Sequence, residues 1–399
     1  QYAGQLNAIH LANIYGVLAK SVRGAADVNR LKTDWKFRGL LKMTNDKLQR
    51  TPQWFGVRAI ATITHSLGKL KIFDERFFNQ VVRLRERIAK EGGPQALSNI
   101  VWACATVGCE SAELLEAVAG EYERIAKTGK VQELSNITWA FAKLECNADA
   151  LFGAVAGEYE RIAASGKVQE LSNICWAFAK LECNADALFE AVAGEYERIA
   201  ESGDVQGMSN ICWAFAKLEC NADALFEAVA GQHKPIAKTG KVQELSNITW
   251  ACATLGYKSV ELLEAVAGEY ERIAKTGDVQ HLSNITWAFA TLGYKSVELL
   301  EAVAGEYERI TKTGEVQHLS NITWACATLG YKSVELLEAV AGEYERIAES
   351  DNVQALSNIT WAFAKLECNA DALFEAVARQ HKLIAERGNV QAMSNICWA

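Results

Sequence analysis

The feature that most constrains this fold is a short segment that recurs at a fixed interval of 37 residues. Residues 131–144 read VQELSNITWAFAKL, and close copies of this segment follow one another to the end of the chain without an insertion. The Asn of its Ser-Asn-Ile core recurs at Asn99, Asn136, Asn173, Asn210, Asn247, Asn284, Asn321, Asn358 and Asn395. Such a period marks stacked repeats, so we expect the 399 residues to form one array.

Apolar residues at helical spacing predict two helices in each unit. In the first helix, Leu134, Ile137 and Phe141 fall on one face, and a second apolar stripe runs from Leu151 to Ile162. One such hairpin leaves apolar faces that only its neighbours can cover. The predicted fold is therefore all-α, with αα-hairpins stacked into a right-handed α-solenoid, a 37-residue period and no sheet.

Residues with special roles at helix ends occupy the turns. We expect Asn147, or Ser259 in a second version of the unit, to cap the start of the second helix. Gly129 is expected to end the second helix of its unit in a left-handed conformation. The Glu-x-Glu-Arg segments, such as 158–161, read as a solvated face with Glu–Arg pairs three residues apart. On this reading Arg161 points away from the apolar stripe of its helix, and Arg161 and Arg198 lie on the solvated convex side.

Charge and sequence similarity divide the chain near residue 93. Residues 1–90 carry 17 Lys and Arg against 6 Asp and Glu, whereas residues 91–399 carry 24 against 43. Residues 1–93 contain degenerate copies of the unit, with about 12 extra residues near 21–34. Residues 94–399 form the near-identical array, which stops in mid-repeat at Ala399, so we expect the chain to be a fragment.

The cysteines and the apolar segments restrict the compartment. Most of the eleven cysteines replace a Thr or a Phe of the repeat, which indicates packed free thiols in an intracellular, reducing compartment and no disulfide. Neither Cys nor His occurs at metal-ligand spacing, so we expect no metal. No stretch approaches 18 consecutive apolar residues, so we expect no membrane span.

No constellation of catalytic residues is visible in the sequence. It contains neither a glycine-rich phosphate loop nor a nucleophile elbow, and no pair of carboxylates stands apart from the surface charges. We therefore expect a protein that is not an enzyme and that takes no cofactor and no small-molecule substrate.

A polar face of the first helix carries the candidate binding residues. Trp139 lies opposite the Ile137 and Phe141 stripe, beside Asn136 and Lys143. The Trp row reads either as platforms for stacked bases or as knobs between repeats, and the Asn row reads either as base readers or as side chains bonded to neighbouring backbone. The residues before Val131 and Leu134 vary between copies, which indicates either a recognition code or drift.

These positions define the candidate nucleic-acid-binding residues. They are Lys130, Asn136, Lys143, Lys167, Asn173, Lys180, Asp204, Asn210, Lys217, Asn247, Asn284, Asn321, Asn352, Asn358 and Lys365.

The repeated LSNITWAFAKL motif resembles the heptatricopeptide and octotricopeptide repeats of organellar RNA-binding proteins, many of which carry a RAP domain that is absent here. The resemblance covers residues 94–399 closely and the preceding residues loosely. It implies a superhelix that binds single-stranded RNA in mitochondria or plastids, about one nucleotide per repeat. The implied roles are RNA stability, processing, translation or ribosome assembly.

The acidic balance of residues 91–399 favours an alternative function, because phosphate contacts normally supply most of the affinity for nucleic acid. That alternative is a protein-binding scaffold, or a structural subunit of an organellar ribonucleoprotein with its basic first 90 residues on RNA. Added salt separates the two, since RNA binding falls steeply with salt and an apolar groove loses little.

Overall fold

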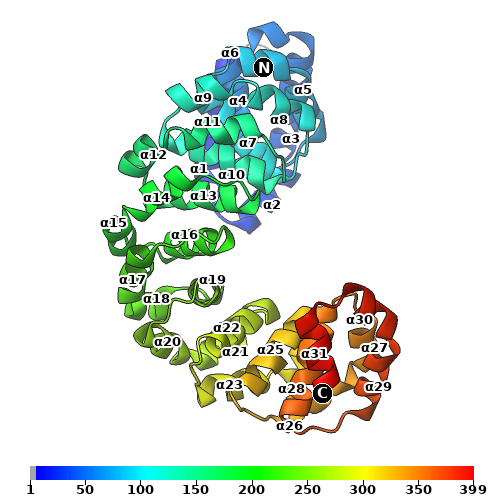
Figure 1. Cartoon of the computed structure of the whole chain (residues 1–399). Helices are drawn as coiled ribbons and strands as arrows, with labels where there is room; N and C mark the ends of the chain where they lie inside the picture. Colours follow the sequence, from blue (N-terminus) through cyan, green and yellow to red (C-terminus); the bar gives the residue numbers. More distant parts are fainter. Residues whose placement is uncertain (1–5) are drawn as a thin grey trace. The chain divides into compact units, whose positions relative to one another are not determined.

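The computed structural model describes residues 6–399, which form α-helices and one short 3-10 helix and contain no β-strand (Figure 1). They divide into two compact units, one ending at Glu195 and the other beginning at Tyr196. Within each unit the helices pack sequentially as stacked repeats. The prediction of an all-α solenoid is confirmed.

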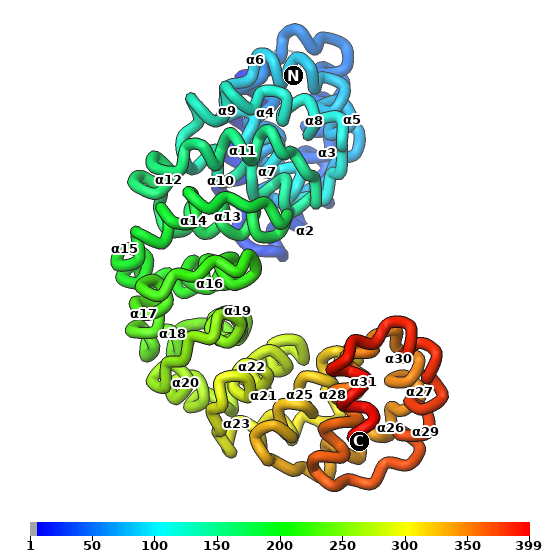
Figure 2. Tube along the Cα trace, in the orientation of Figure 1, coloured from blue at the N-terminus to red at the C-terminus, as the bar shows by residue number. Residues whose placement is uncertain are grey.

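The first helices of successive repeats lie side by side and form one layer of each unit. In the first unit this layer comprises α1 (Ala8–Ser21), α4 (Val57–Lys69), α7 (Pro94–Val107), α10 (Val131–Lys143) and α13 (Val168–Lys180). In the second unit it comprises α16 (Val205–Lys217), α19 (Val242–Thr254), α22 (Val279–Thr291), α25 (Val316–Thr328), α28 (Val353–Lys365) and α31 (Val390–Trp398). In the second unit these helices line the inner side of a curved stack (Figure 2).

The second half of each repeat is broken into two short helices, so the prediction of one continuous second helix is wrong. In the first unit the pairs are α5 (Glu75–Arg83) with α6 (Arg85–Glu91), α8 (Ala112–Ala119) with α9 (Tyr122–Thr128), and α11 (Asp149–Ala156) with α12 (Tyr159–Ser165), followed by α14 (Asp186–Ala193). The second unit begins with α15 (Tyr196–Glu201). Its pairs are α17 (Asp223–Gly231) with α18 (His233–Thr239), α20 (Val260–Ala267) with α21 (Tyr270–Thr276), α23 (Val297–Ala304) with α24 (Tyr307–Thr313), α26 (Val334–Gly342) with α27 (Tyr344–Ala348), and α29 (Asp371–Arg379) with α30 (His381–Arg387).

The break occurs at the Gly-Glu pair between the two short helices. At Gly157–Glu158 the Glu158 N–H donates to Val155 O at 3.1 Å, and regular bonding resumes only when Ile162 N–H reaches Glu158 O. The short helix after the break then packs on the next repeat, as α12 does on α14. The apolar period alone does not reveal this break, because Val155 and Ile162 are both fully buried on either side of it.

Two predicted helix ends differ in the structure. Gly129 has φ −71° and ψ 137°, so it is extended and not left-handed. The left-handed residue instead follows the first helix, where Glu145 has φ 51° and Gly256 of the sister version has φ 72°. Ser259 caps α20 by accepting the Leu262 N–H, as expected, whereas α11 begins after Ala148 without a side-chain cap and Asn147 is exposed.

Gly129 is required for space. A Cβ at this position would lie 2.6 Å from Ile125 O and 3.0 Å from Leu134 Cδ2. Gly92, Gly166, Gly240, Gly277, Gly314 and Gly388 meet the same kind of obstacle in their repeats. The glycine therefore lets the end of one repeat come close to the first helix of the next.

The core of each unit is formed by the apolar faces of both layers. Leu134, Ile137, Phe141, Leu151 and Ile162 have no exposed surface, and burying each such side chain contributes about 1.5–3 kcal/mol. The predicted core face is thus confirmed.

Of the cysteines predicted at Thr- and Phe-equivalent positions, Cys104, Cys175, Cys212, Cys252 and Cys326 are buried, whereas Cys397 in the last helix is exposed. All eleven cysteines are free thiols. Thr138 and Cys175 occupy equivalent positions and are both fully buried. Burial raises the pKa of the Cys252 and Cys326 thiols to about 12, so both stay protonated and unreactive at neutral pH.

The N-terminal residues complete the first unit with two further helices. The extra residues near 21–34 contain α2 (Ala25–Thr33), and the long helix α3 (Trp35–Arg50) follows, with the 3-10 helix η2 (Pro52–Trp54) at its end. The α1 helix packs on α4 and α3 packs on α5, so this basic segment is joined to the repeats that follow it. Between residues 6 and 399, no helix combines the length and apolar character needed to cross a membrane.

We predict that Gly129→Ala lowers the free energy of unfolding by about 1–3 kcal/mol, because the new methyl group displaces Ile125 O or Leu134. Gly153→Ala is the matched control. Gly153 lies inside α11 with no atom within 4 Å of the added Cβ, so this change stabilises the helix by up to about 1 kcal/mol. Urea denaturation followed by circular dichroism measures both, and equal shifts for the two variants would contradict the steric argument.

Candidate nucleic-acid interface

The exposed side of each first helix from α7 to α28 carries a stripe of four side chains. In α10 these are Gln132, Asn136, Trp139 and Lys143, which share one face because they are four, three and four residues apart. Gln132 and Lys143 are exposed, and Asn136 and Trp139 are half-buried. The last position is Thr in α7, α19, α22 and α25. The stripe contains amides, an indole and a cation or hydroxyl, and no carboxylate.

The Asn row links one repeat to the one before it. Asn173 Nδ2 donates to Ser135 Oγ at 3.3 Å, and Asn247 and Asn321 make the same bond to Ser209 and Ser283 at 3.4 and 3.1 Å. The expected bond to neighbouring backbone is therefore replaced by a bond to a side chain. The acceptor is a buried Ser hydroxyl, whose burial without a partner would be costly.

The row of Asn–Ser bonds between repeats is incomplete in the second unit. The hydroxyls of Ser246, Ser320 and Ser357 are buried and have no partner. The Asn of the following repeat turns elsewhere, as when Asn358 Oδ1 accepts a bond from Gln354 Nε2 at 2.9 Å. Gln317 donates in the same way to Asn321. Asn321 makes both kinds of bond at once, since it also donates to Ser283, so the amide groups of the stripe bond along their own helix and to the preceding repeat.

The Trp row lies between the core and the surface. Trp102 to Trp361 are all half-buried, and Trp398 in the last helix is 59% exposed. Trp102 packs edge-on against His65, its counterpart in the preceding repeat, with ring centroids 5.1 Å apart. Part of each ring packs against the protein and part faces solvent. The row is therefore compatible both with knobs between repeats and with platforms for stacked bases.

One lysine at the end of the stripe pairs with a carboxylate of the preceding repeat. Lys180 Nζ is 3.1 Å from Glu145 Oε1, the residue in the left-handed conformation after α10. Lys143, Lys217 and Lys365 are exposed at the equivalent positions. Ion pairs of this kind contribute little to stability in water, so the lysines can exchange a carboxylate for a phosphate.

The variable positions at the start of each first helix are capping positions. Where the residue before the helix is Lys, as at Lys130, Lys167 and Lys241, its backbone N–H donates to the carboxylate of a Glu three residues later at 2.9–3.0 Å. Where it is Asp or Asn, its own side chain accepts the N–H of that later residue, as Asp204 does from Gly207 and Asn352 from Ala355. The two positions vary together because either residue can supply the cap.

The Arg of the Glu-x-Glu-Arg segment fastens each repeat to the preceding one. Arg161 Nη1 donates to Gly129 O at 2.7 Å and Nη2 donates to Ala126 O at 2.6 Å, while Glu158 holds Nε at 2.9 Å. Arg124, Arg272, Arg309 and Arg346 make equivalent bonds. The predicted Glu–Arg pair is confirmed. The prediction that Arg161 merely faces solvent is wrong, because the helix break before it turns this side chain toward the preceding repeat.

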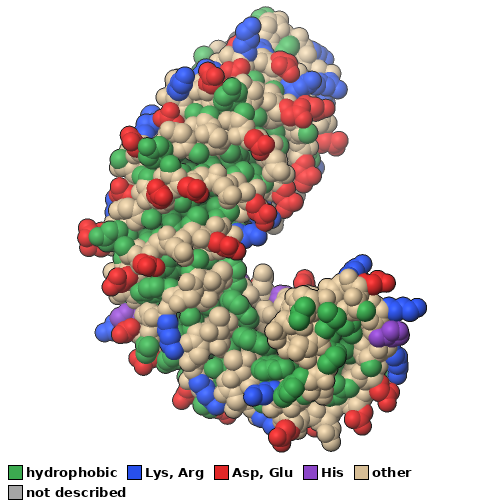
Figure 3. Space-filling view, in the orientation of Figure 1, with side chains coloured by type: hydrophobic (Ala, Val, Ile, Leu, Met, Phe, Trp, Pro, Cys, Tyr) green, Lys and Arg blue, Asp and Glu red, His purple; other side chains and the backbone are tan. Residues whose placement is uncertain are grey.

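Charged side chains are distributed unevenly over the surface. On the face shown in Figure 3 they gather mainly at the outer rims of the units, and uncharged side chains cover much of the area between. Glu123, Glu160, Glu271 and Glu308, which belong to the short second helices, are exposed. The first-helix stripe is therefore less acidic than the net charge of −8 suggests.

Comparison with known families identifies the chain at the level of a family. The sequence model of the RNA-editing substrate-binding complex 6 protein family matches residues 28–313, more than half of the chain. The chain belongs to this family. A comparison with curated protein sequences gives no significant match.

Membership of the RNA-editing substrate-binding complex 6 protein family corrects the resemblance drawn from the motif. The matching family is neither the heptatricopeptide nor the octotricopeptide family, and the agreement lies in the helical-repeat architecture. Its match begins in α2 and ends in α24, so it spans the basic N-terminal segment and much of the near-identical array.

In this member of the family, the structure places the candidate residues in three positions. The asparagines at 136, 173, 210, 247, 284, 321 and 358 are half-buried in the stripe, and the lysines at 143, 180, 217 and 365 are exposed at its end. Lys130, Lys167, Asp204 and Asn352 are the N-cap residues of their helices. The sequence places Gln132 on the same face, but the candidate binding residues did not include the Gln row, although the recurrence of Gln four residues before each Asn was a visible signal.

No group of three or more His, Cys, Asp or Glu side chains within residues 6–399 is arranged to hold a metal ion. The interface therefore consists of amides, indoles, hydroxyls and lysines. Such groups recognise a polymer by hydrogen bonding, stacking and charge.

We predict that Arg161→Ala lowers the free energy of unfolding by about 2 kcal/mol, because it removes two charge-assisted hydrogen bonds between repeats. Lys127→Ala removes an exposed cation from the same region and should change it by less than about 0.5 kcal/mol. Urea denaturation compares the two variants, and hydrogen exchange locates the loss at residues 126–129. An Arg161 variant as stable as the Lys127 variant would contradict the fastening role.

Proposed function

We propose that the chain binds single-stranded RNA through the first-helix stripes of its two units and serves, without enzymatic activity, as a helical-repeat subunit of an RNA-editing substrate-binding complex in the mitochondrion. The observation that carries this proposal is the Gln-Asn-Trp stripe, which recurs at the interval of the repeats from α7 to α31 and ends in Lys in α10, α13, α16 and α28. The name of the family, which refers to an RNA-editing substrate-binding complex, supports the RNA ligand. The resemblance of the repeat motif to those of organellar RNA-binding proteins supports the mitochondrial setting.

The chemistry of the stripe suits a single strand. Amide groups form paired hydrogen bonds with base edges, and each half-exposed indole offers a face on which a base can stack. Helical repeats that read one base with two or three side chains are a known solution to this problem. Because the stripe has no carboxylate, a phosphate backbone lying along it meets lysines and hydroxyls.

RNA would displace weak internal contacts at the stripe. The Asn–Ser and Gln–Asn bonds have lengths of 2.8–3.4 Å, and several buried Ser hydroxyls still lack a partner. An amide that turns toward a base can leave its Ser acceptor without breaking the helix. The Asn side chains therefore link neighbouring repeats in the free protein and can turn to bond a base when RNA binds.

A protein-binding scaffold is the second candidate function, and the acidic outer surface favours it. Residues 91–399 carry 43 acidic against 24 basic side chains, and many of the exposed ones lie on the short second helices. The two functions use different surfaces of the same stack. A subunit of a ribonucleoprotein can hold RNA on the first helices and a basic protein on the second helices.

We predict that Lys143→Glu, Lys180→Glu, Lys217→Glu and Lys365→Glu together weaken binding of a mixed-sequence single-stranded RNA. The slope of log affinity against log salt should fall by up to about 2.8, since each contact with a single strand contributes about 0.7. Lys180 contributes less than an unpaired lysine would, because Glu145 already neutralises part of its charge. Fluorescence anisotropy over a series of salt concentrations measures the effect.

The matched control reverses four exposed lysines on the second helices, Lys90, Lys127, Lys275 and Lys312. Arg161 also lies on a second helix, but it is not a suitable control because it bonds two repeats together. If both sets reduce binding equally, the effect is one of net charge and the stripe is not the site. If the unmodified protein binds no single-stranded RNA at low salt, the RNA function fails. Crosslinking followed by sequencing then identifies the bound RNA in cells.

A further inference from the structure

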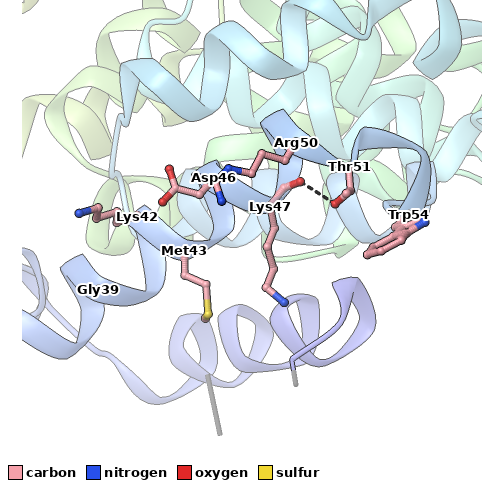
Figure 4. Close-up of a pocket in the computed structure, with 8 residues that line it drawn as sticks. All are labelled: Gly39, Lys42, Met43, Asp46, Lys47, Arg50, Thr51 and Trp54. Carbon is pink, nitrogen blue, oxygen red and sulfur yellow. Dashed lines mark hydrogen bonds between the residues drawn. The ribbon is translucent and has the colours of Figure 1, made fainter. Parts of the chain in front are cut away.

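The N-terminal helices present a hollow that is separate from the first-helix stripe. It lies on α3 and is lined by Lys42, Met43, Asp46, Lys47, Arg50 and Trp54, with a volume of about 500 Å³ (Figure 4). We call this hollow the α3 groove. Lys42 lies toward one end of it and Trp54, from η2, at the other, with Arg50 between them.

The α3 groove lies in the most basic stretch of the chain. Residues 20–58 carry ten Lys and Arg against the acids Asp27, Asp34 and Asp46. Two of these acids are engaged: Asp34 caps α3 by accepting the Phe37 N–H, and Asp46 pairs with Arg76 at 2.8 Å. Lys42 and Arg50 are exposed and form no ion pair with any residue among 6–399. Their charges are therefore directed to solvent or to a ligand.

The groove also carries an aromatic ring that folding does not use. Trp54 is 74% exposed, whereas Trp102 to Trp361 in the array are half-buried. Leaving so large an apolar surface in water is unfavourable, and an exposed ring in a positively charged groove is the usual arrangement of a platform on which bases stack. Its neighbour Thr51 is fixed by a bond to Lys47 O at 2.9 Å, which holds η2 at the end of α3.

The floor of the groove is fixed before any ligand binds. Lys47 Nζ donates to Leu6 O at 2.6 Å, so its position is set by the chain itself. Lys42 and Arg50 are eight residues apart on one helix, which separates them by about 12 Å along its axis. Two cations at this spacing with a ring at one end match an extended backbone, and a compact anion would reach only one of them.

We propose that the α3 groove binds a segment of single-stranded RNA, with Lys42 and Arg50 on phosphates and a base stacked on Trp54. The inference rests on the proposed function, because it assumes that RNA is the ligand, and it adds a site outside the first-helix stripe. The groove anchors RNA by charge and stacking without reading its sequence, since it offers few donors and acceptors to base edges.

The test uses the full chain and a fluorescent single-stranded RNA of about 30 nucleotides of mixed sequence. Lys42→Glu with Arg50→Glu should weaken binding at least about tenfold and lower the salt slope by about 1.4. Trp54→Ala should weaken it about 5- to 150-fold, and Trp54→Phe should restore most of the affinity because the ring remains. Circular dichroism checks that the variants fold. We expect them to fold, because the substituted side chains are exposed.

Two controls match these changes. Lys90→Glu with Lys127→Glu makes the same change of charge elsewhere in the first unit, and Trp35→Ala removes a ring of similar exposure, 76%, outside the groove. Both should leave the affinity within about threefold of the unmodified protein. If the groove variants behave like these controls while the stripe variants lose binding, the α3 groove is overturned and the proposed function stands. If the unmodified protein binds no RNA, the proposed function itself fails. If the groove variants keep RNA but lose a protein partner on purification, the groove is a protein interface and the inference is wrong.

Discussion

Successive first helices pack against one another along each unit, and this contact removes Leu134, Ile137 and Phe141 completely from water. A single hairpin has too little apolar surface to offset the entropy of ordering its backbone, so each repeat depends on its neighbours. The other features of the repeat serve this contact. Gly129 leaves space for Leu134, the break at Gly157–Glu158 turns the chain toward the neighbour, and small buried residues such as Thr138 fit between the layers.

Polar bonds then fix how one repeat sits on the next. Arg161 joins its own short helix to two carbonyl oxygens of the preceding repeat, and Asn173 joins its helix to Ser135. The two linkers differ in strength. The Arg bonds are charge-assisted and short, whereas the Asn bonds are neutral, longer and missing at some repeats. The rigid linkage therefore lies on the second-helix side, and the adjustable one lies on the surface proposed to take the ligand.

The separation of charge follows from the same division of labour. The short second helices bury one face in the core and expose Glu and Lys on the other. The acidic character of the array therefore comes from these helices, and the first-helix stripe carries no carboxylate. The basic charge is concentrated around α2 and α3, where the hollow on α3 combines it with an exposed indole. The N-terminal helices can therefore attract a polyanion, and the stripe can accept one, whereas the acidic exposed face of the short second helices repels it.

The period of 37 residues and the apolar spacing in the sequence determined the all-α class, the stacking of repeats and the buried face of each first helix. They determined these because helical periodicity is local and one hairpin cannot bury its own faces. The pairing of Lys130 with Glu133 and of Asp204 with Gly207 as alternative caps was also present in the sequence, although its meaning appears only with the hydrogen bonds. Only the tertiary structure decided that the second helix breaks, that Gly129 provides space and not a left-handed turn, and that Arg161 reaches its neighbour. The Arg161 bonds join residues 32 and 35 positions apart in the sequence that meet only when repeats stack, and no local pattern of residues records where such partners will lie.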